Sequence, residues 1–143
     1  MSITIRSICL AGIAAALLPI VVAGTGCTGF PTAPGVQNVT PEEAAALIQA
    51  HAGDADFVIM DVRNPEEFAG GHIQDAVNVC YLCPTFADSI AALDKSKTYF
   101  VYCGTEHRSP LATAAMIDAG FTSVYNLTGG LMNWQGEGYP VVQ

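Results

Sequence analysis

The sequence predicts an α/β domain in which helices cover both faces of a parallel sheet. Strand-like and helix-like segments alternate along the chain after residue 40, the strand-like segments are short and apolar, and glycines follow the helix-like ones. Continuous apolar runs suit strands that are buried on both faces. The alternation implies parallel strands with right-handed crossover connections.

The first half of the predicted domain holds two helices and two strands. Thr40-Pro41-Glu42-Glu43 is a capping box with proline at the first helical position, so a helix is expected from there to about Ala52. The apolar run 57–62 predicts a buried strand, and 76–79 is a second short strand candidate. Residues 85–93 predict a helix with alanine and isoleucine on one side.

The second half repeats this alternation. It comprises a strand over 99–102, a helix over 107–119 that Gly120 ends, a strand over 123–127 and a closing helix over 130–135. Ligands of parallel sheets bind beyond the carboxyl ends of the strands. Cys103 stands at such an end and is the first candidate for a functional residue.

The composition indicates one domain with an acidic surface. The chain has 143 residues, 51% of them apolar, which is enough to fill a core. Thirteen carboxylates outnumber five Lys and Arg, and the net charge is −8. This negative net charge disfavours nucleic acid and anionic membranes as partners. Its simplest explanation is that the carboxylates lie on a solvent-exposed surface.

Residues 1–27 predict an export signal. Arg6 precedes an uncharged apolar stretch over 8–22, and small residues lead to Cys27. That stretch falls short of the roughly 20 residues that cross a bilayer, so an uncleaved transmembrane anchor is the weaker alternative.

Cys27 after small residues resembles the lipobox of prokaryotic lipoproteins, which implies a lipid anchor on this cysteine. Gly24 departs from that motif, which usually has a bulky aliphatic there, and cleavage after Ala23 is the competing possibility. Either way the domain, expected over 39–143, is exported and works outside the cytoplasm. Residues 28–38, with two prolines, are expected to form a flexible tether.

Cys103 lies in a connection that must turn tightly. Its strand ends there and the next helix begins within about four residues, a turn that Gly104 permits. Backbone N–H groups of the loop and of the helix start can then point at the sulfur and favour its anion. The alternative is a buried cysteine that acts as a small hydrophobe.

Three ordered blocks of sequence carry a resemblance to a known family. The blocks are Asp61-Val62-Arg63, Glu67-Phe68, Gly71-His72-Ile73, Ala76 and Asn78; then Cys103, Arg108 and Ser109; then Leu127-Thr128-Gly129-Gly130, Trp134, Gly138 and Pro140-Val141. From Asn38 to the end the chain resembles a single-domain rhodanese. The resemblance implies a parallel sheet of about five strands with helices on both faces.

The resemblance also implies a sulfurtransferase of the thiosulfate type, in which Cys103 accepts a sulfane sulfur, holds it as a persulfide and passes it to a nucleophile. Gly104, Thr105, Glu106, His107 and Arg108 would form the anion-holding loop, with Arg108 on the anionic substrate and Ser109 at the helix start. Structural support is expected from Asp61, Arg63, Glu67 and His72. The expected partners are a small sulfur donor and a thiol acceptor, or a persulfide-bearing protein, with no cofactor, no metal and a monomeric chain.

The loop departs from the family pattern at two positions. Gly104 stands where members that use thiosulfate usually have arginine, and Glu106 stands where the loop is commonly neutral. A carboxylate about 7 Å from the sulfur would disfavour an anion by roughly 2 kcal/mol, unless it points into solvent and is screened. Thiosulfate is therefore expected to be a poor donor, and an uncharged or protein-borne persulfide a better one.

Cys80 and Cys83 are a second departure from the family. They could form a structural disulfide or a redox pair that resolves the Cys103 persulfide. A zinc site would need two further ligands, and no second C-x-x-C is present.

Three other functions remain open. Gly104 and Glu106 fit a binding module without turnover. A phosphatase of the related fold would place arginine six positions after the cysteine, where this chain has Ser109. A thiol oxidoreductase would use Cys80 and Cys83, although no strand leads directly into a C-x-x-C helix start.

Overall fold

The computed structural model describes residues 35–143. The predicted export signal, Cys27 and residues 28–34 of the predicted tether lie outside the described residues. Within residues 35–143, every helix is too short or too polar to cross a membrane.

The described chain alternates strands and helices along its whole length. The elements are β1 (Val36–Val39), α1 (Pro41–Ala50), β2 (Phe57–Asp61), α2 (Pro65–Ala69), β3 (Val77–Asn78), α3 (Phe86–Ala91), β4 (Thr98–Tyr102), α4 (Ser109–Asp118), β5 (Ser123–Leu127) and α5 (Gly130–Gly136). Each predicted helix and strand is present, with ends that shift by up to about two residues, as is usual where helices fray and strand pairing stops.

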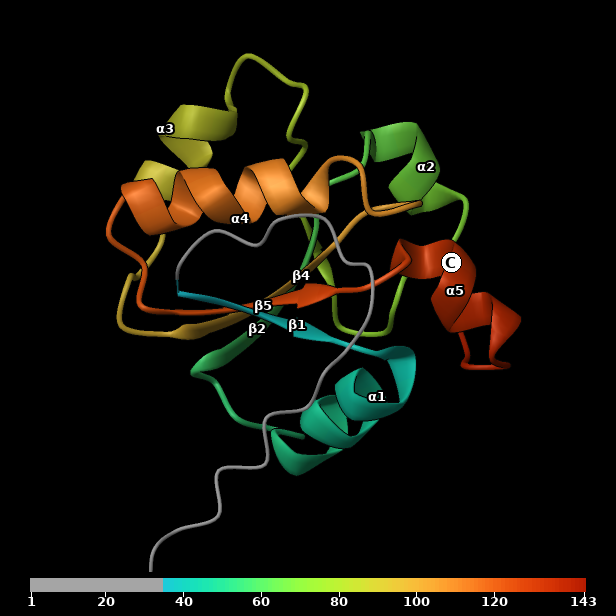
Figure 1. Ribbon diagram of the computed structural model, residues 1–143. Helices are drawn as coiled ribbons and strands as arrows, with labels where there is room; N and C mark the ends of the chain where they lie inside the picture. The colour runs from blue at the N-terminus through green and yellow to red at the C-terminus, as the bar shows by residue number, and fades with distance from the viewer. Residues whose placement is uncertain (1–34) are drawn as a thin grey trace, which may run out of the picture.

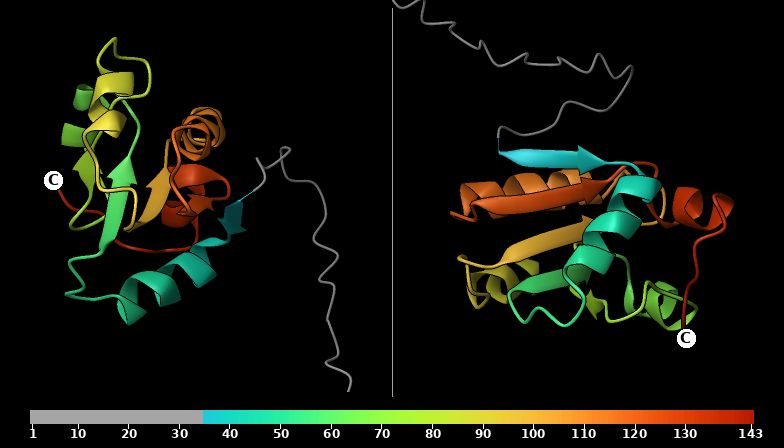
Figure 2. Two further views of the ribbon diagram at one scale, coloured as in Figure 1. Left: turned by 90° about the vertical axis from the view of Figure 1, so that its left-hand side faces the viewer. Right: turned by 90° about the horizontal axis from the view of Figure 1, so that it is seen from below.

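The five strands form one parallel sheet in the order β1-β5-β4-β2-β3. Helices α3 and α4 cover one face, and α1 lies on the opposite face (Figures 1 and 2). The predicted fold class, a parallel sheet with helices on both faces, is confirmed.

Strand β4 divides its side chains between the two cores. Tyr99, Val101 and Cys103 face a cluster with residues of α3 and α4, whereas Phe100 and Tyr102 face a cluster with residues of α1 and α5. All five are nearly inaccessible to solvent, because successive side chains of a strand point to opposite faces and both faces are covered. The end of β4 is therefore held in place on both faces of the sheet.

The predicted tether is corrected at its carboxyl end. Residues 36–38 belong to β1, whose Val36 is paired with Val124 and whose Asn38 is paired with Asn126 of β5. This edge strand is not recognisable in the sequence, because four residues are too few to show a clear alternation of apolar and polar side chains and the preceding proline and glycine favour a loop.

Helix α2 was not predicted, although its signals are present. Asn64 is the N-cap, Pro65 occupies the first helical position, and the Glu67 carboxylate accepts a hydrogen bond from the Asn64 N–H at 3.1 Å. This arrangement is a capping box with asparagine in place of serine or threonine. The five-residue helix shows almost no apolar period, which explains why it escaped notice.

Candidate sulfur-transfer site

Cys103 lies where the carboxyl end of β4 meets the loop that leads into α4. The residue is 1% exposed and packs in the cluster shared with α3 and α4. It is the only cysteine of residues 35–143 that is not in a disulfide. Residues 104–108 connect the strand to Ser109, the first residue of α4, so the sulfur stands at the base of a short loop.

The beginning of α5 docks on the beginning of this loop. The N–H groups of Leu131 and Met132 donate to the carbonyl oxygens of Cys103 and Gly104, at 2.8 Å and 3.0 Å. Gly130 permits this approach, since its φ is +63° and a β-carbon there would lie 2.6 Å from the Gly104 oxygen. The sequence pattern included Gly130 without revealing this role, which depends on contact between segments distant in the chain.

A Gly130→Ala variant is expected to be destabilised by about 2 kcal/mol or more, because the methyl group would overlap two carbonyls at a strained φ. Gly136→Ala is the matched control in the same helix, since a β-carbon there meets nothing within 4 Å. Urea unfolding of both variants measures the difference. Equal free energies of unfolding of the two variants would show that the loop can shift at little cost and that α5 does not fix its position.

The tight turn of the loop occurs at Glu106 rather than at Gly104. Glu106 has a φ of +66°, whereas the backbone of Gly104 is not left-handed. A β-carbon at Gly104 would make ordinary contacts of 3.6–3.9 Å with Arg108, Arg63 and Glu67. The left-handed residue of the turn that Gly104 was expected to permit is therefore Glu106.

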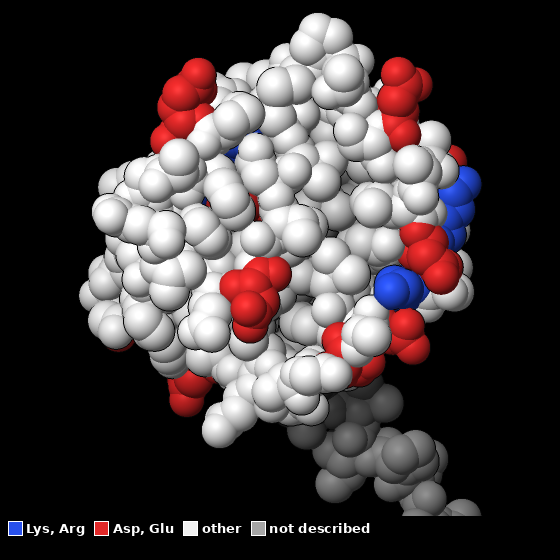
Figure 3. Space-filling view, turned by 180° about the vertical axis from the view of Figure 1, so that it is seen from behind, with Lys and Arg blue, Asp and Glu red and all other residues white. Residues whose placement is uncertain are grey.

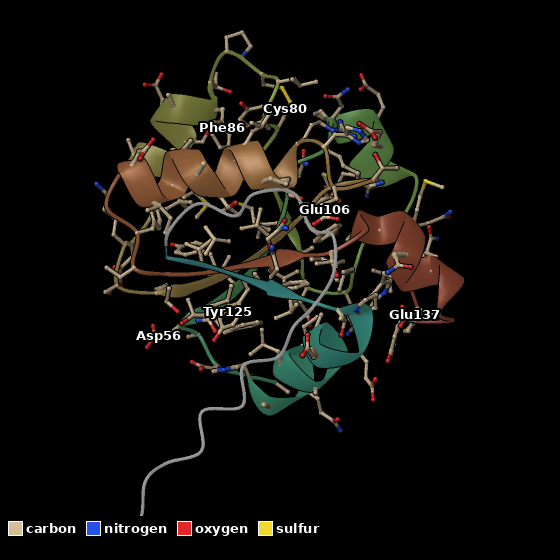
Figure 4. The ribbon with its side chains drawn as sticks, viewed as in Figure 1. Asp56, Cys80, Phe86, Glu106, Tyr125 and Glu137 are labelled. Carbon is tan, nitrogen blue, oxygen red and sulfur yellow. A yellow bond between two sulfur atoms is a disulfide. The ribbon has the colours of Figure 1, made fainter. Side chains whose placement is uncertain are left out.

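The Glu106 side chain has a structural partner. Its carboxylate accepts a hydrogen bond from the Gly129 N–H at 2.7 Å and a longer one, at 3.4 Å, from the Asn126 amide of β5. This contact ties the loop to the segment between β5 and α5, and Figure 4 shows Glu106 close to the beginning of α4. The carboxylate is thus neither simply in solvent nor without a partner, and its charge is offset in part by donors outside the loop.

Several donors of the loop lack partners among the described residues. The N–H groups of Gly104, Thr105, Glu106 and Arg108 donate to no backbone carbonyl of residues 35–143. The Ser109 hydroxyl is fully buried and has no hydrogen-bond partner in the same part of the chain. A buried donor without an acceptor is costly, so the Ser109 hydroxyl favours an acceptor bound beside it, and the loop N–H groups remain available as further donors.

Arg108 is engaged by a carboxylate of α2. Its two terminal nitrogens donate to the two carboxylate oxygens of Glu67 at 2.6 Å and 2.8 Å. The hydrogen bonds from Arg108 lower the pKa of Glu67 from 4.5 to about 2. Because this folded-state pKa lies below the ordinary one, the pair stabilises the fold above about pH 4.5, and this contribution is lost as the pH falls toward 2.

Asp61 and Arg63 form a buried pair beneath the site. The guanidinium donates to the Asp61 carboxylate at 2.6–3.0 Å and to the Gly71 carbonyl at 2.7 Å. The ring of His72 stacks on Phe68, and its Nδ1 lies 2.9 Å from the Phe68 carbonyl oxygen. These contacts fit a supporting role, because none of them involves the Cys103 side chain.

Cys80 and Cys83 are joined by a disulfide in the turn after β3. Both are half-buried, and the Cys80 sulfur lies 3.6 Å from the Asn64 side-chain oxygen at the beginning of α2. The pair is thus a disulfide in this structure rather than two metal ligands.

Cations available to an anionic substrate are scarce at this end of the molecule. Arg63 and Arg108 are paired with Asp61 and Glu67, and Lys97 lies 2.8 Å from the Ala55 carbonyl before β2, at the opposite end of the sheet. Carboxylates dominate the charged groups of the face in Figure 3. The positive charge of the loop is therefore largely neutralised.

The chain is similar in sequence and in fold to rhodanese-like proteins. The model of the rhodanese-like domain matches residues 40–137. A thiosulfate sulfurtransferase GlpE of Stutzerimonas stutzeri is 35% identical over 99 residues, 69% of this chain and 84% of the relative. A sulfurtransferase of Allochromatium vinosum is 32% identical over 70% of this chain and 92% of that protein. The crystal structure of a rhodanese-related protein from Thermoplasma volcanium has a TM-score of 0.64 and 26% identity, over 74% of this chain and 97% of that one.

Proposed function

The chain belongs to the rhodanese-like domain family, and from this premise we propose that it is a sulfurtransferase that carries sulfane sulfur as a persulfide on Cys103. The observation that carries the proposal is the placement of Cys103 at the end of β4, beneath a loop with unpartnered donors. Within residues 35–143 it is the one cysteine outside the disulfide. These donors support a negatively charged sulfur and would also support the outer sulfur of a persulfide.

The reaction divides into two displacements at sulfur. The Cys103 thiolate attacks the sulfane sulfur of the donor, the donor's sulfur–sulfur bond breaks, and its electron pair leaves with the donor as sulfite or a thiolate. An acceptor nucleophile then attacks the outer sulfur of the persulfide, and the electron pair of that bond returns to Cys103 as thiolate. In the proposed reaction the N–H groups of Gly104, Thr105, Glu106 and Arg108, together with the Ser109 hydroxyl, stabilise the charge on sulfur.

Both arginines near Cys103 are already paired with carboxylates, which supports a sulfur donor of low charge. Arg108 is held by Glu67 and Arg63 by Asp61, so a dianion such as thiosulfate would have to compete with an existing ion pair. The sequence-based argument for the same preference relied on Glu106, which instead binds Gly129. The preference for an uncharged or protein-borne persulfide thus rests on Glu67.

Exposed apolar side chains support a protein as the sulfur donor or acceptor. Leu111 lies in the first turn of α4 and is 55% exposed, and Met132, next to the Gly104 carbonyl, is 66% exposed. Large exposed apolar side chains next to a reactive site are typical of surfaces that contact another protein.

A Glu67→Gln variant is expected to lower the KM for thiosulfate roughly tenfold, because it frees the Arg108 charge while glutamine can still cap Asn64. Glu66→Gln is the control, since it removes the same charge from an exposed position of the same helix. Steady-state assays with thiosulfate and cyanide measure both. An unchanged KM in Glu67→Gln, or an equal fall in Glu66→Gln, would exclude Glu67 as the determinant.

Steady-state kinetics tests the proposed function itself. Initial rates with a varied persulfide donor and a varied thiol acceptor are expected to give parallel double-reciprocal lines, because a covalent intermediate separates the two half-reactions. No turnover with thiosulfate or with glutathione persulfide would favour the alternative of a binding module.

The disulfide supports the proposal that the chain works outside the cytoplasm. Disulfides persist in oxidising compartments and are rare in the cytosol, and Cys80–Cys83 is half-buried rather than sealed in the core. Cell fractionation of the full chain, and of a Cys27→Ser variant that lacks the proposed lipid acceptor, tests export and anchoring. Recovery of the full chain in the cytoplasm would contradict this proposal.

A further inference from the structure

Strand β2 lies between β3, which leads to the Cys80–Cys83 turn, and β4, which leads to Cys103. Both cysteine segments therefore lie beyond the carboxyl ends of the strands. Asp61 of β2 is level with both Asn78 of β3 and Tyr102 of β4. Cys80 and Cys103 follow these partners by two residues and by one. Two strand spacings of about 4.8 Å put the two chain segments roughly 10 Å apart.

Backbone hydrogen bonds continue past the strands and hold the two segments together. The Val62 N–H donates to the Tyr102 carbonyl at 3.0 Å, and the Tyr81 N–H donates to the Val62 carbonyl at 3.1 Å. Val62 and Cys103 belong to one buried cluster, and Tyr81 packs against that cluster. The disulfide turn therefore packs on the same face of the sheet as the Cys103 sulfur.

A second set of contacts joins the turn to the Cys103 loop. The Cys80 sulfur is 3.6 Å from the side-chain oxygen of Asn64, the N-cap of α2, and Glu67 of that helix binds both the Asn64 N–H and Arg108. Figure 4 shows Cys80 and Glu106 at the end of the molecule that carries α2. The disulfide, the beginning of α2 and the Cys103 loop thus form one continuous group.

The two sulfur centres differ in accessibility. Cys103 is 1% exposed, whereas Cys80 and Cys83 are half-buried and Leu82 between them is 64% exposed. An external thiol can therefore reach the Cys80–Cys83 pair more readily than the sulfur of Cys103. A C-x-x-C pair in this position can carry two electrons from a reductant to the buried site.

We propose that Cys80 and Cys83, in their reduced form, take the sulfane sulfur from the Cys103 persulfide and release it as hydrosulfide. This activity rests on the proposed persulfide function. It adds a second route by which sulfur leaves Cys103, namely reductive release as hydrosulfide, which we call the reductive outlet. In the first step a Cys80 or Cys83 thiolate attacks the outer sulfur, the bond between the two sulfurs on Cys103 breaks, and Cys103 leaves as thiolate. The sulfur then forms a persulfide on the pair.

The second thiol of the pair completes the reaction. It attacks the inner sulfur of the new persulfide, which forms the Cys80–Cys83 disulfide and expels hydrosulfide with the bonding electrons. The sulfane sulfur gains two electrons and the two thiols lose two, with their protons shared between Cys103 and the hydrosulfide. An external dithiol, as carried by thiol–disulfide exchange proteins, restores the pair by disulfide exchange. The structure thus holds the product state of the pair.

A single-turnover experiment tests this outlet. The protein is reduced, freed of reductant and mixed anaerobically with one equivalent of glutathione persulfide. Reduced wild type is expected to release close to one hydrosulfide per chain and to regain the Cys80–Cys83 disulfide. Cys80→Ser/Cys83→Ser and oxidised wild type are expected to release at least about tenfold less and to keep the added sulfur on Cys103.

The same experiment separates failure of this inference from failure of the proposed function. If reduced wild type keeps the sulfur on Cys103 as firmly as Cys80→Ser/Cys83→Ser does, the reductive outlet is wrong while the persulfide carrier stands. If Cys103→Ser releases hydrosulfide as fast as wild type, the pair acts alone and the outlet is equally wrong. If no form gains a sulfur or releases hydrosulfide, both proposals fail. Oxidised wild type provides a form with both cysteines unaltered, in case the double variant does not fold.

Discussion

A Cys103→Ser variant is expected to lose sulfur transfer down to the background rate, a fall of at least about a thousandfold in kcat/KM. Serine keeps nearly the shape of cysteine, but its hydroxyl cannot form the persulfide that separates the two half-reactions. Thiocyanate formation from a persulfide donor and cyanide, corrected for the reaction without protein, measures the loss.

The stability of this variant provides the control. Cys103 packs among apolar side chains at 1% exposure, so serine should lower the free energy of unfolding only modestly, and the protein should still unfold cooperatively. If the variant is folded but inactive, the loss of sulfur transfer is due to the missing thiol and not to unfolding. A folded variant with wild-type turnover would show that Cys103 is a core residue without a chemical role.

An Asp61→Ala variant is expected to lose about 3–5 kcal/mol of stability, the largest effect on folding anticipated for this chain. Asp61 is fully buried and binds Arg63 through both carboxylate oxygens, so its removal leaves a buried guanidinium charge without its carboxylate. The remaining acceptor for that guanidinium is the Gly71 carbonyl. Chemical denaturation followed by circular dichroism measures the change.

Asp56→Ala is the matched control for Asp61→Ala. Asp56 lies 3.8 Å from Lys97 on the surface with 81% of its side chain exposed, so its loss should change stability by less than about 1 kcal/mol. Similar effects of the two substitutions would mean that the buried pair is replaceable and that Asp61 does not anchor the site.

The parallel sheet could be predicted because its central strands are mostly apolar and most of its helices have clear ends. The strands predicted over 57–62 and 123–127 agree almost to the residue with β2 and β5, since burial on both faces favours mainly apolar runs, with Asp61 and Asn126 as buried polar exceptions. Edge strand β1 is not predicted because only its two end residues, Val36 and Val39, are half-buried, while the two between them are polar and exposed. Local pattern is weak where tertiary pairing decides the structure.

The position of Cys103 at a strand end could be predicted from the alternation of elements, but the partners of the loop residues could not. Glu106 reaches Gly129, 23 residues further on, and Arg108 reaches Glu67, 41 residues earlier. Both contacts depend on how distant segments meet at the edge of the sheet. The sequence alone therefore attributed the expected donor preference to Glu106, whereas the proposal from the structure attributes it to Glu67.

The mass of the intact protein after incubation with a persulfide donor tests the central claim most directly. With the Cys80–Cys83 disulfide intact, the account predicts that wild type gains one sulfur atom, that peptide mapping finds it on Cys103, and that cyanide removes it as thiocyanate. Cys103→Ser should gain none. An unchanged mass of wild type under the same conditions, or an added sulfur on any other residue, would contradict the account.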